Sequence, residues 1–308
     1  METRRIGTLE VSAVGLGCNN FGTRLDYDGT AAVVEAALDA GITFFDTADI
    51  YGRGRSEEFL GGILGPRRSH VVIATKFGME MGEGRQGARP DYVRRAVADS
   101  LKRLRTDHID LYQLHRPDPA TPIAETLAAL DGLVRAGQVR EIGCSFFTAA
   151  ELEAARAAAG AGAKFASVQN EYSLLHREPE RGVLAECERQ GLGFLPYYPL
   201  ASGILTGKHR RGGGTARGTR LASNAEWARR FLTDHNLAVA EALAAFAASR
   251  GRTLLELAVS WLLSRPVVAS VIAGASSPAQ VRANAAAGAW RIAPDGLAEI
   301  DKLTEGVT

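Results

Sequence analysis

Short apolar or β-branched runs alternate with longer amphipathic stretches along nearly the whole chain. A strand that is buried on both faces shows a continuous apolar run instead of alternating polarity, so these runs are typical of parallel strands. Eight such strands are predicted. They are Val14–Gly17, Thr43–Asp46, Val71–Lys76, Ile109–His115, Val139–Ser145, Ala166–Asn170, Leu192–Tyr198 and Ala269–Ala273.

The stretches between the predicted strands carry apolar residues at helical spacing, and many begin with a capping Ser, Thr or Asp or an early Pro. The clearest are Gly29–Ala40, Asp91–Leu104, Ile123–Ala136 and Ala149–Ala159. A strict strand-then-helix order implies parallel strands joined by right-handed crossovers, and eight units close a barrel. We therefore predict one α/β domain over residues 1–308, a (β/α)8 TIM barrel.

Two segments fall outside this repeat. Thr3–Ile6 and Leu9–Ser12 flank Gly7 and Thr8 and predict a β-hairpin ahead of the barrel. The other segment, Thr206–Thr233, is polar and contains a glycine-rich basic run, which by composition alone indicates a solvated surface loop. Because it follows the seventh predicted strand, we expect it on the rim that carries the ends of the strands.

The composition narrows the classes of partner. Of 308 residues, 46% are hydrophobic, which is enough for one large core. With 36 Lys and Arg against 35 Asp and Glu, the net charge is +1, so no general attraction to nucleic acid or to a membrane surface results. We therefore expect a small-molecule partner, with no nucleic acid and no membrane involved.

The cysteines, the N-terminus and the longest apolar stretch indicate the cellular compartment. Cys18, Cys144 and Cys187 are odd in number and far apart, without a Cys-x-x-Cys pair, and the histidines show no ligand spacing. This pattern argues against a disulfide framework and a zinc site, so no metal is expected. The N-terminus leads into no apolar signal segment, and charged residues interrupt the apolar stretch Leu254–Gly274. A cytoplasmic protein is the expectation.

Four residues with acid–base chemistry, Asp46, Tyr51, Lys76 and His115, lie at or just past the ends of three successive predicted strands. In a parallel barrel the strand ends face one mouth, so these side chains are expected to converge on one substrate atom. Taken alone, each has a structural explanation, as a packed rim aromatic, a salt bridge or a structural histidine. Their coincidence favours a proton-transfer site.

Competing motifs have little support. Gly15-Leu-Gly17 begins like a dinucleotide-binding fingerprint, but Asn20 stands where the third glycine is required. The chain has no Gly-x-x-x-x-Gly-Lys phosphate loop, no Gly-x-Ser-x-Gly elbow and no His-Glu-x-x-His motif. Phosphoryl transfer, serine hydrolysis and zinc catalysis therefore lack their usual signatures.

The four residues and their spacing resemble the catalytic tetrad of the aldo-keto reductases, and the resemblance extends from Arg5 to Asn284. It implies a nicotinamide-dependent oxidoreductase that interconverts an aldehyde or ketone with its alcohol. It also implies that the N-terminal hairpin plugs the bottom of the barrel and that the loop Thr206–Thr233 closes over the cofactor.

The chemistry of carbonyl reduction explains why the four residues of the tetrad are of these types. Hydride addition leaves negative charge on the carbonyl oxygen, so a proton donor must lie within hydrogen-bond reach of that oxygen. Tyr51 is the expected acid, and the nearby charge of Lys76 would favour the phenolate. Asp46 would hold Lys76 in place and charged, while His115, as a neutral imidazole, would orient the carbonyl.

The resemblance also assigns cofactor-binding residues. Two residues would grip the carboxamide, one aromatic ring would stack on the nicotinamide, and two segments would hold the pyrophosphate and the adenosine end. In that order they are Ser145 and Gln169; Tyr197; Leu200, Ser202, Gly203 and Lys208; and Gly274, Ser276, Ser277, Gln280 and Asn284.

Two positions depart from the family pattern. Phe146 stands where the family usually has an asparagine that completes the carboxamide grip, so the cofactor binds more loosely there or the ring reshapes the substrate pocket. The adenosine segment lacks the usual basic partner of a 2′-phosphate and offers only Arg282 and two serines. We still expect NADP(H) to be preferred, by a small margin, with NAD(H) possible.

The substrate pocket is expected to be polar. By resemblance its wall includes Asn19, Asn20, Phe21, Tyr27, Arg116 and Phe146. A sugar, a polyol or a hydroxylated ketone would fit such a wall better than a flat apolar ketone. Two other functions stay open: a cofactor-binding regulatory subunit, like the potassium-channel beta subunits that share this fold and tetrad, and a cofactor-free isomerase.

Overall fold

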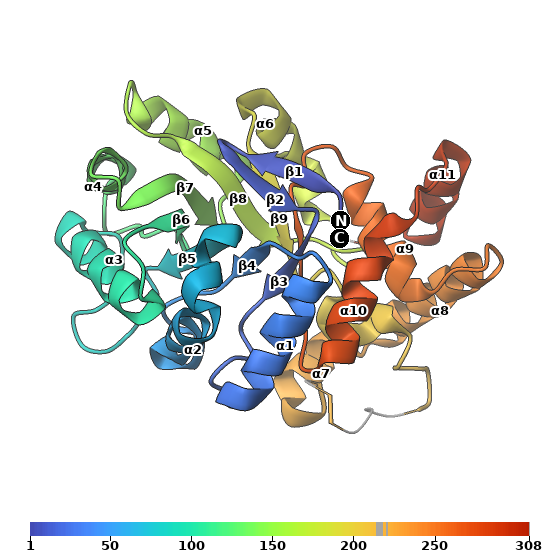
Figure 1. Cartoon of the computed structure of the whole chain (residues 1–308). Helices are drawn as coiled ribbons and strands as arrows, with labels where there is room; N and C mark the ends of the chain where they lie inside the picture. The colour runs from blue at the N-terminus through green and yellow to red at the C-terminus, as the bar shows by residue number, and fades with distance from the viewer. Residues whose placement is uncertain (214–217, 220, 308) are drawn as a thin grey trace.

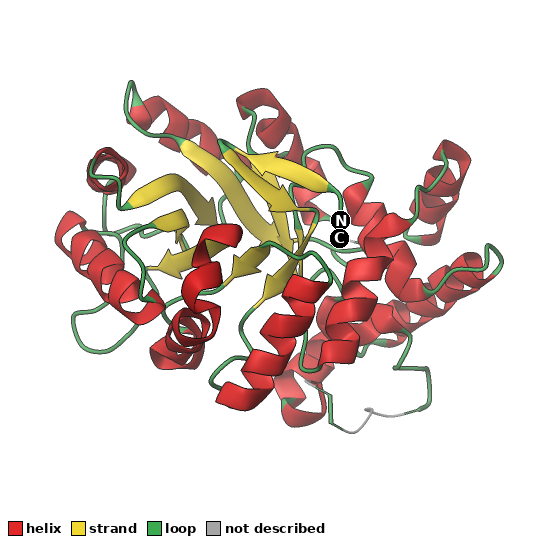
Figure 2. Cartoon of the chain, viewed as in Figure 1, coloured by secondary structure: helices red, strands yellow, loops and turns green. Residues whose placement is uncertain are grey.

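A barrel of eight parallel strands forms the centre of the chain (Figures 1 and 2) in the computed structural model, which describes residues 1–213, 218–219 and 221–307. The strand order is β10-β3-β4-β5-β6-β7-β8-β9. Hydrogen bonds between Phe194 and the segment before β10 close the ring: Phe194 N to Val267 O at 2.7 Å and Ala269 N to Phe194 O at 2.9 Å. The strands are β3 (Val14–Gly17), β4 (Phe44–Asp46), β5 (Val72–Phe77), β6 (Ile109–Leu114), β7 (Val139–Ser145), β8 (Phe165–Glu171), β9 (Gly193–Tyr197) and β10 (Val271–Gly274). The predicted TIM barrel is confirmed.

Helices surround the barrel on its outside (Figure 2). Local sequence explains several of their starts: Asp26 caps α1 by accepting from Gly29 N, and Thr148 and Glu151 form a capping box on α5. The four helices predicted by range are present, with ends shifted by no more than two residues. The helices that follow strands in this ring are α1 (Tyr27–Asp39), α2 (Arg55–Leu64), α3 (Pro90–Leu104), α4 (Ile123–Arg135), α5 (Ala149–Ala159), α6 (Val183–Gln190) and α10 (Pro278–Ala286).

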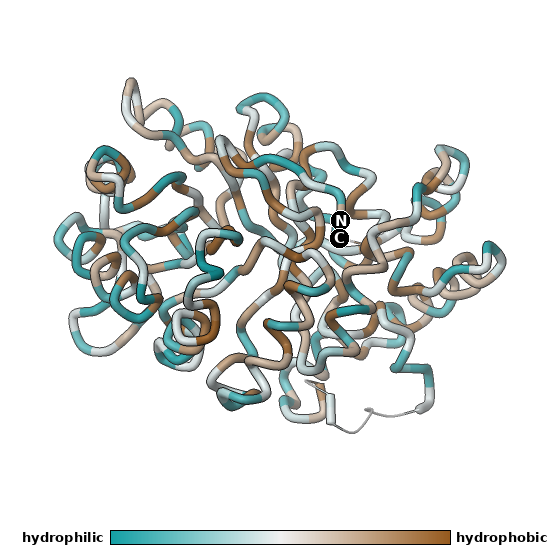
Figure 3. Tube along the Cα trace, viewed as in Figure 1, coloured by the Kyte–Doolittle hydropathy of each residue, from teal (hydrophilic) through white to brown (hydrophobic). Residues whose placement is uncertain are grey.

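The apolar residues form two cores. One fills the barrel interior and includes Phe44, Leu111 and Leu195, all fully buried. The other lies between the strands and the helices, and Figure 3 shows hydrophobic segments along the central strands with mixed polarity along the outer helices. Each large buried side chain contributes about 1.5–3 kcal/mol, so the strands are held from both faces, which explains their continuous apolar runs.

The N-terminal hairpin closes one end of the barrel. Its strands β1 (Thr3–Ile6) and β2 (Leu9–Ser12) place fully buried apolar side chains in the interior core. Arg4 also donates to the carbonyl oxygens of Leu263, Arg265 and Val268 near the end of α9 (Leu254–Leu263). The predicted plug is thus present, and the site must open at the opposite end.

The connection between β9 and β10 is long and partly helical. The predicted loop Thr206–Thr233 contains a short turn at Leu221–Ser223 and the helix α7 (Ala225–Phe231), while residues 214–217 and 220 lie outside the described part. Trp227 on α7 packs edge-on against Tyr198, with ring centroids 5.0 Å apart. Helices α8 (Asp234–Ala248) and α9 follow, and α11 (Pro294–Leu303) ends the fold. Every described helix is too short or too polar to cross a bilayer.

Candidate active site

A cavity of about 650 Å³ opens at the carboxyl ends of the strands. This volume is typical of sites that bind drug-sized molecules and cofactors. Asp46, Tyr51 and His115 line it, and Lys76 is fully buried beneath them. The structure therefore brings the predicted tetrad together around one opening. Within the described residues, no group of His, Cys, Asp or Glu side chains is arranged to hold a metal ion.

The buried pair of Lys76 and Asp46 is the centre of the site. Lys76 Nζ lies 2.6 Å from Asp46 Oδ2 and donates to Thr47 O at 2.9 Å. Burial alone lowers the pKa of Lys76, but the charges of Asp46 and Tyr51 raise it above its usual value. Lys76 therefore stays protonated at neutral pH.

The second carboxylate oxygen of Asp46 is also satisfied. Asp46 Oδ1 accepts from Gln169 Nε2 at 2.9 Å and from Gln113 Nε2 at 3.3 Å. Gln113 was not among the predicted site residues. It lies two positions before His115, and side chains two positions apart along β6 point to the same face. This alternation could have placed Gln113 beside His115 in the site.

Tyr51 lies directly above the buried ammonium. Lys76 Nζ is 5.1 Å from the centroid of the Tyr51 ring. Burial raises the pKa of Tyr51 above its usual value, although the charge of Lys76 and its hydrogen bond lower it. The expected effect of Lys76 on the phenol is thus present but smaller than the effect of burial. Tyr51 remains a phenol at neutral pH, which suits a proton donor.

His115 faces Tyr51 edge-on, with ring centroids 6.1 Å apart. Burial, followed by the charges of Lys76 and Arg116, lowers the pKa of His115 to about 3. The imidazole is therefore neutral at physiological pH. Its Nδ1 atom is buried and has no hydrogen-bond partner among the described residues, while the residue itself lines the cavity.

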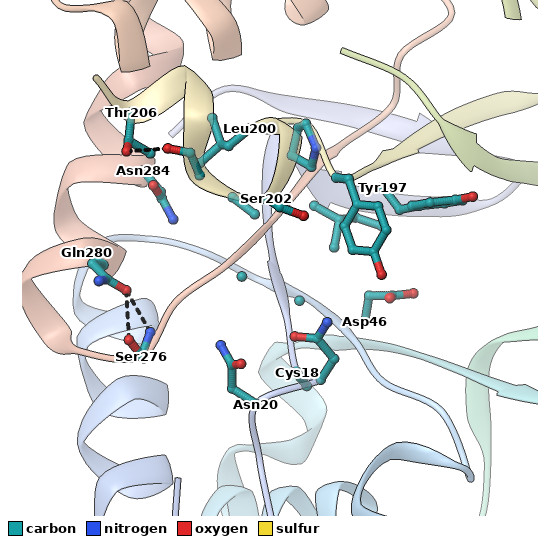
Figure 4. Close-up of a pocket in the computed structure, with 18 of the residues that line it drawn as sticks. Cys18, Asn20, Asp46, Tyr197, Leu200, Ser202, Thr206, Ser276, Gln280 and Asn284 are labelled. Atoms are coloured by element: carbon teal, nitrogen blue, oxygen red, sulfur yellow. Dashed lines mark hydrogen bonds between the residues drawn. The ribbon is translucent and has the colours of Figure 1, made fainter. Parts of the chain in front are cut away.

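The residues assigned to the cofactor surround the same cavity, apart from one (Figure 4). Ser277 instead caps α10 by accepting from Gln280 N. The residues that line the cavity are Ser145, Gln169, Tyr197, Leu200, Ser202, Gly203, Lys208, Gly274, Ser276, Gln280 and Asn284.

The donor set fits a nicotinamide dinucleotide. Ser145 Oγ donates to Gln169 O at 2.6 Å, so its lone pairs can accept from a carboxamide NH2 group. Ser202 Oγ is buried without a partner among the described residues, and Figure 4 shows Ser202 beside Tyr197 at the cavity. A Cβ added to Gly274 would lie 3.6 Å from its nearest neighbour, the side chain of Asn19, so the Gly274 backbone has room for a ligand beside it.

Phe146 adopts a backbone conformation that a bulky residue rarely takes. Its φ is 62°, in the left-handed region that suits Gly and Asn. The side chain is 45% exposed, its ring lies 5.2 Å from that of Tyr197, and the Arg116 guanidinium is 5.7 Å away. The asparagine that the family usually has would fit this conformation without strain, whereas Phe146 fits only with strain and presents an aromatic wall to the cavity.

The predicted substrate residues divide into two groups. Asn19, Asn20 and Phe146 line the cavity. Phe21 is fully buried in the core, and Tyr27 packs on Phe59 of α2, with ring centroids 5.3 Å apart, so both lie away from it. Arg116 is exposed and is not among the residues that line the cavity, but its guanidinium contacts the ring of Phe146. Several lining residues were not predicted, among them Arg24, Thr206, Thr219 and Leu255.

A buried acidic network lies behind Tyr51. Asp49 N donates to Lys76 O at 3.1 Å, while Asp49 Oδ1 has no partner among the described residues. Nearby, Glu57 accepts from Thr75 and Arg103, each at 2.6 Å. Burial, followed by the charge of Glu57, raises the pKa of Asp49 to about 7.

Comparison with known proteins agrees with this geometry. The sequence model of the Aldo/keto reductase family matches residues 13–305, so the chain belongs to that family. It is 33% identical to the aldo-keto reductase YhdN of Bacillus subtilis over 96% of this chain and 91% of that one. It is 35% identical to a probable voltage-gated potassium channel subunit beta of Oryza sativa subsp. japonica, over 92% and 90% of the two chains.

A solved structure shares the fold. The glycerol dehydrogenase AKR11B4 from Gluconobacter oxydans superposes with a TM-score of 0.86 at 29% identity, covering 99% of this chain and 96% of that chain. The chain is thus an oxidoreductase of the aldo-keto reductase family by descent and by fold.

Replacing Asp49 with asparagine is expected to change how stability depends on pH. Because the pKa of Asp49 rises from 3.8 to about 7 on folding, protonation favours the folded state, and this contribution is lost as pH rises through that range. The amide that replaces the carboxyl group cannot ionise, so the melting temperature of the variant relative to wild type should increase from pH 4 to pH 8. Calorimetry at both pH values measures this difference in melting temperature, and Glu58→Gln, at an exposed position, is the control. A constant difference would contradict the assignment.

Replacing Phe146 with asparagine is expected to relieve strain and to open the substrate wall. The left-handed backbone costs a bulky residue ~1 kcal/mol, so the melting temperature should rise by about 2 °C. The Michaelis constant for the substrate should rise as well, because apolar contact area is lost. Phe146→Leu keeps the strain and loses the ring, and should show only the second effect. Tighter cofactor binding without a substrate effect would mean that the ring merely occupies an amide site.

Proposed function

We propose that the protein is an NADP(H)-dependent oxidoreductase that interconverts an aldehyde or ketone with its alcohol, with Tyr51 as the general acid and base. The observation that carries this proposal is the buried Lys76–Asp46 pair beneath Tyr51, at 2.6 Å, with the neutral His115 facing the same cavity. A protonated phenol, a buried cation and a neutral imidazole around one opening are what carbonyl reduction requires.

The protein's own groups handle the proton and the developing charge. His115 donates a hydrogen bond to the carbonyl oxygen and orients it. As negative charge develops on that oxygen, the Tyr51 hydroxyl donates its proton to it. Lys76 then stabilises the phenolate, and Asp46 keeps Lys76 fixed and charged. The nicotinamide, when bound, supplies the hydride, and in the oxidative direction Tyr51 accepts the proton.

A hydroxylated carbonyl compound is the proposed substrate class. Asn19 and Asn20 line the cavity and can exchange hydrogen bonds with hydroxyl groups. The similarity to a glycerol dehydrogenase supports a polyol or a small sugar derivative as the alcohol. The exposed ring of Phe146 gives the opposite wall an apolar surface on which a carbon chain can pack.

A regulatory subunit is the second candidate function. The similarity to a probable voltage-gated potassium channel subunit beta supports it, because that relative is named for its assembly and not for a reaction. Such a protein would bind a nicotinamide cofactor with little turnover and would co-purify with a larger partner. Because the potassium-channel beta subunits share the tetrad, turnover and not the presence of the tetrad separates the two candidate functions.

A carbonyl and polyol panel tests the proposal. Each compound is supplied with NADPH, NADH or their oxidised forms, and absorbance of the reduced nicotinamide is followed. We expect turnover with hydroxylated carbonyls and a small preference for NADPH, because no basic residue beyond Arg282 stands in the adenosine segment. Binding without turnover would favour the regulatory subunit, and no binding of either cofactor would favour a cofactor-free isomerase. Equal or better efficiency with NADH would contradict the cofactor preference.

Replacing Tyr51 with phenylalanine removes only the hydroxyl. Turnover is expected to fall by at least ~100-fold, which is the scale of losing a general acid, while cofactor affinity changes little. Lys76→Met should also lower turnover, and it should shift the pH profile because the charge that stabilises the phenolate is gone. Steady-state kinetics across pH and cofactor fluorescence titration separate the two effects. Wild-type turnover in Tyr51→Phe would refute the role of Tyr51.

A further inference from the structure

Arg24 belongs to none of the residue sets that the family resemblance assigned. It lies on the loop between β3 and α1 and lines the cavity. Its guanidinium donates to the carbonyl oxygen of Gly218 at 3.1 Å. Because Gly218 is part of the connection between β9 and β10, the Arg24 side chain joins two separate segments of the cavity wall.

The backbone of Arg24 is held in place. The amides of Arg24 and Leu25 both donate to Asn20 O, at 3.0 and 2.9 Å. Asn20 Nδ2 in turn donates to Ala275 O at 2.9 Å, which ties this loop to the segment after β10. The loop therefore folds around Asn20 and is tied through it to the segment after β10, which holds the backbone from which the Arg24 side chain projects.

A second cation lies close to Arg24. Lys208 also lines the cavity, and burial, followed by the charge of Arg24, lowers the pKa of Lys208. A Cβ added to Gly203 would lie 3.0 Å from Lys208 Nζ, so the ammonium group lies over Gly203. Among the described residues, neither cation has a carboxylate partner. Two like charges held together cost free energy unless an anion lies between them.

The wall of the same cavity offers a further donor. The buried hydroxyl of Ser202 lines the cavity without a partner among the described residues. A hydroxyl, an ammonium and a guanidinium around one stretch of cavity match a group that carries two negative charges and only accepts hydrogen bonds.

We propose that Arg24 and Lys208 together bind the pyrophosphate of the nicotinamide dinucleotide, with Arg24 as its second cation. The inference rests on the proposed function for the identity of the ligand. The pyrophosphate is favoured over a 2′-phosphate because Lys208 lies over Gly203, in the segment that follows Tyr197, whereas the adenosine residues Gln280 and Asn284 are on α10. Loss of Arg24 should therefore weaken every ligand that contains the pyrophosphate.

Calorimetric titration of wild type, Arg24→Gln and Arg24→Lys with NADPH, NADH and ADP-ribose tests this. Glutamine keeps a donor for the carbonyl of Gly218, so its effect reports the lost charge. We expect the dissociation constants of all three ligands to rise about tenfold in Arg24→Gln and to recover in part in Arg24→Lys. High salt should reduce the difference. Arg135→Gln is the control, because Arg135 is exposed on α4 and paired with Asp131 at 2.9 Å.

Each possible result of these titrations either supports or overturns the role of Arg24. Unchanged affinities in Arg24→Gln would overturn it, and a loss confined to NADPH would place Arg24 at the 2′-phosphate instead. An Arg24-dependent affinity for all three ligands in a protein without carbonyl turnover would support this site and refute the oxidoreductase proposal. A wild-type protein that binds none of the three ligands would refute both.

Discussion

The buried ion pair between Lys76 and Asp46 is the constraint on which the site depends. Taking a lysine fully out of water costs several kcal/mol unless its charge is well compensated. Here the compensation comes from Asp46 at the end of β4, from the carbonyl of Thr47 that follows it, and from the side-chain amides of Gln113 on β6 and Gln169 on β8, which complete the carboxylate. The barrel must hold these strands in one register for the pair to form, so the fold and the chemistry have the same requirement.

The N-terminal hairpin determines at which end of the barrel the site lies. It fills the barrel from one end with apolar side chains such as Ile6, Leu9 and Val11, and the cavity with the tetrad opens at the carboxyl ends of the strands. Polar groups that cannot be satisfied in the interior therefore collect at that opening. His115 is an example: it lines the cavity, its ring is neutral, and one buried ring nitrogen has no partner among the described residues.

Much of this architecture could be predicted from sequence, because continuous apolar runs and capping residues are local signals. The strand positions, the hairpin and the convergence of Asp46, Tyr51 and His115 follow from those signals and from barrel geometry. What escaped prediction depends on tertiary contacts. The helix α7 is stabilised by packing of Trp227 on Tyr198, and the placement of Arg24 on the cavity wall comes from a hydrogen bond across two loops. Neither leaves a periodic pattern in the chain.

The hydrogen bonds of Gln169 connect two regions that the chemistry treats as separate. Its side chain donates to Asp46, and its main-chain carbonyl accepts from Ser145, so the proposed carboxamide-binding position and the Lys76–Asp46 pair share one residue. We expect binding at one of these positions to change the energetics of the other, and such coupling is reciprocal. In evolutionary terms, substitutions at residues 145 and 169 and substitutions around the Lys76–Asp46 pair are expected to be epistatic, so this part of the barrel diverges as a unit or not at all.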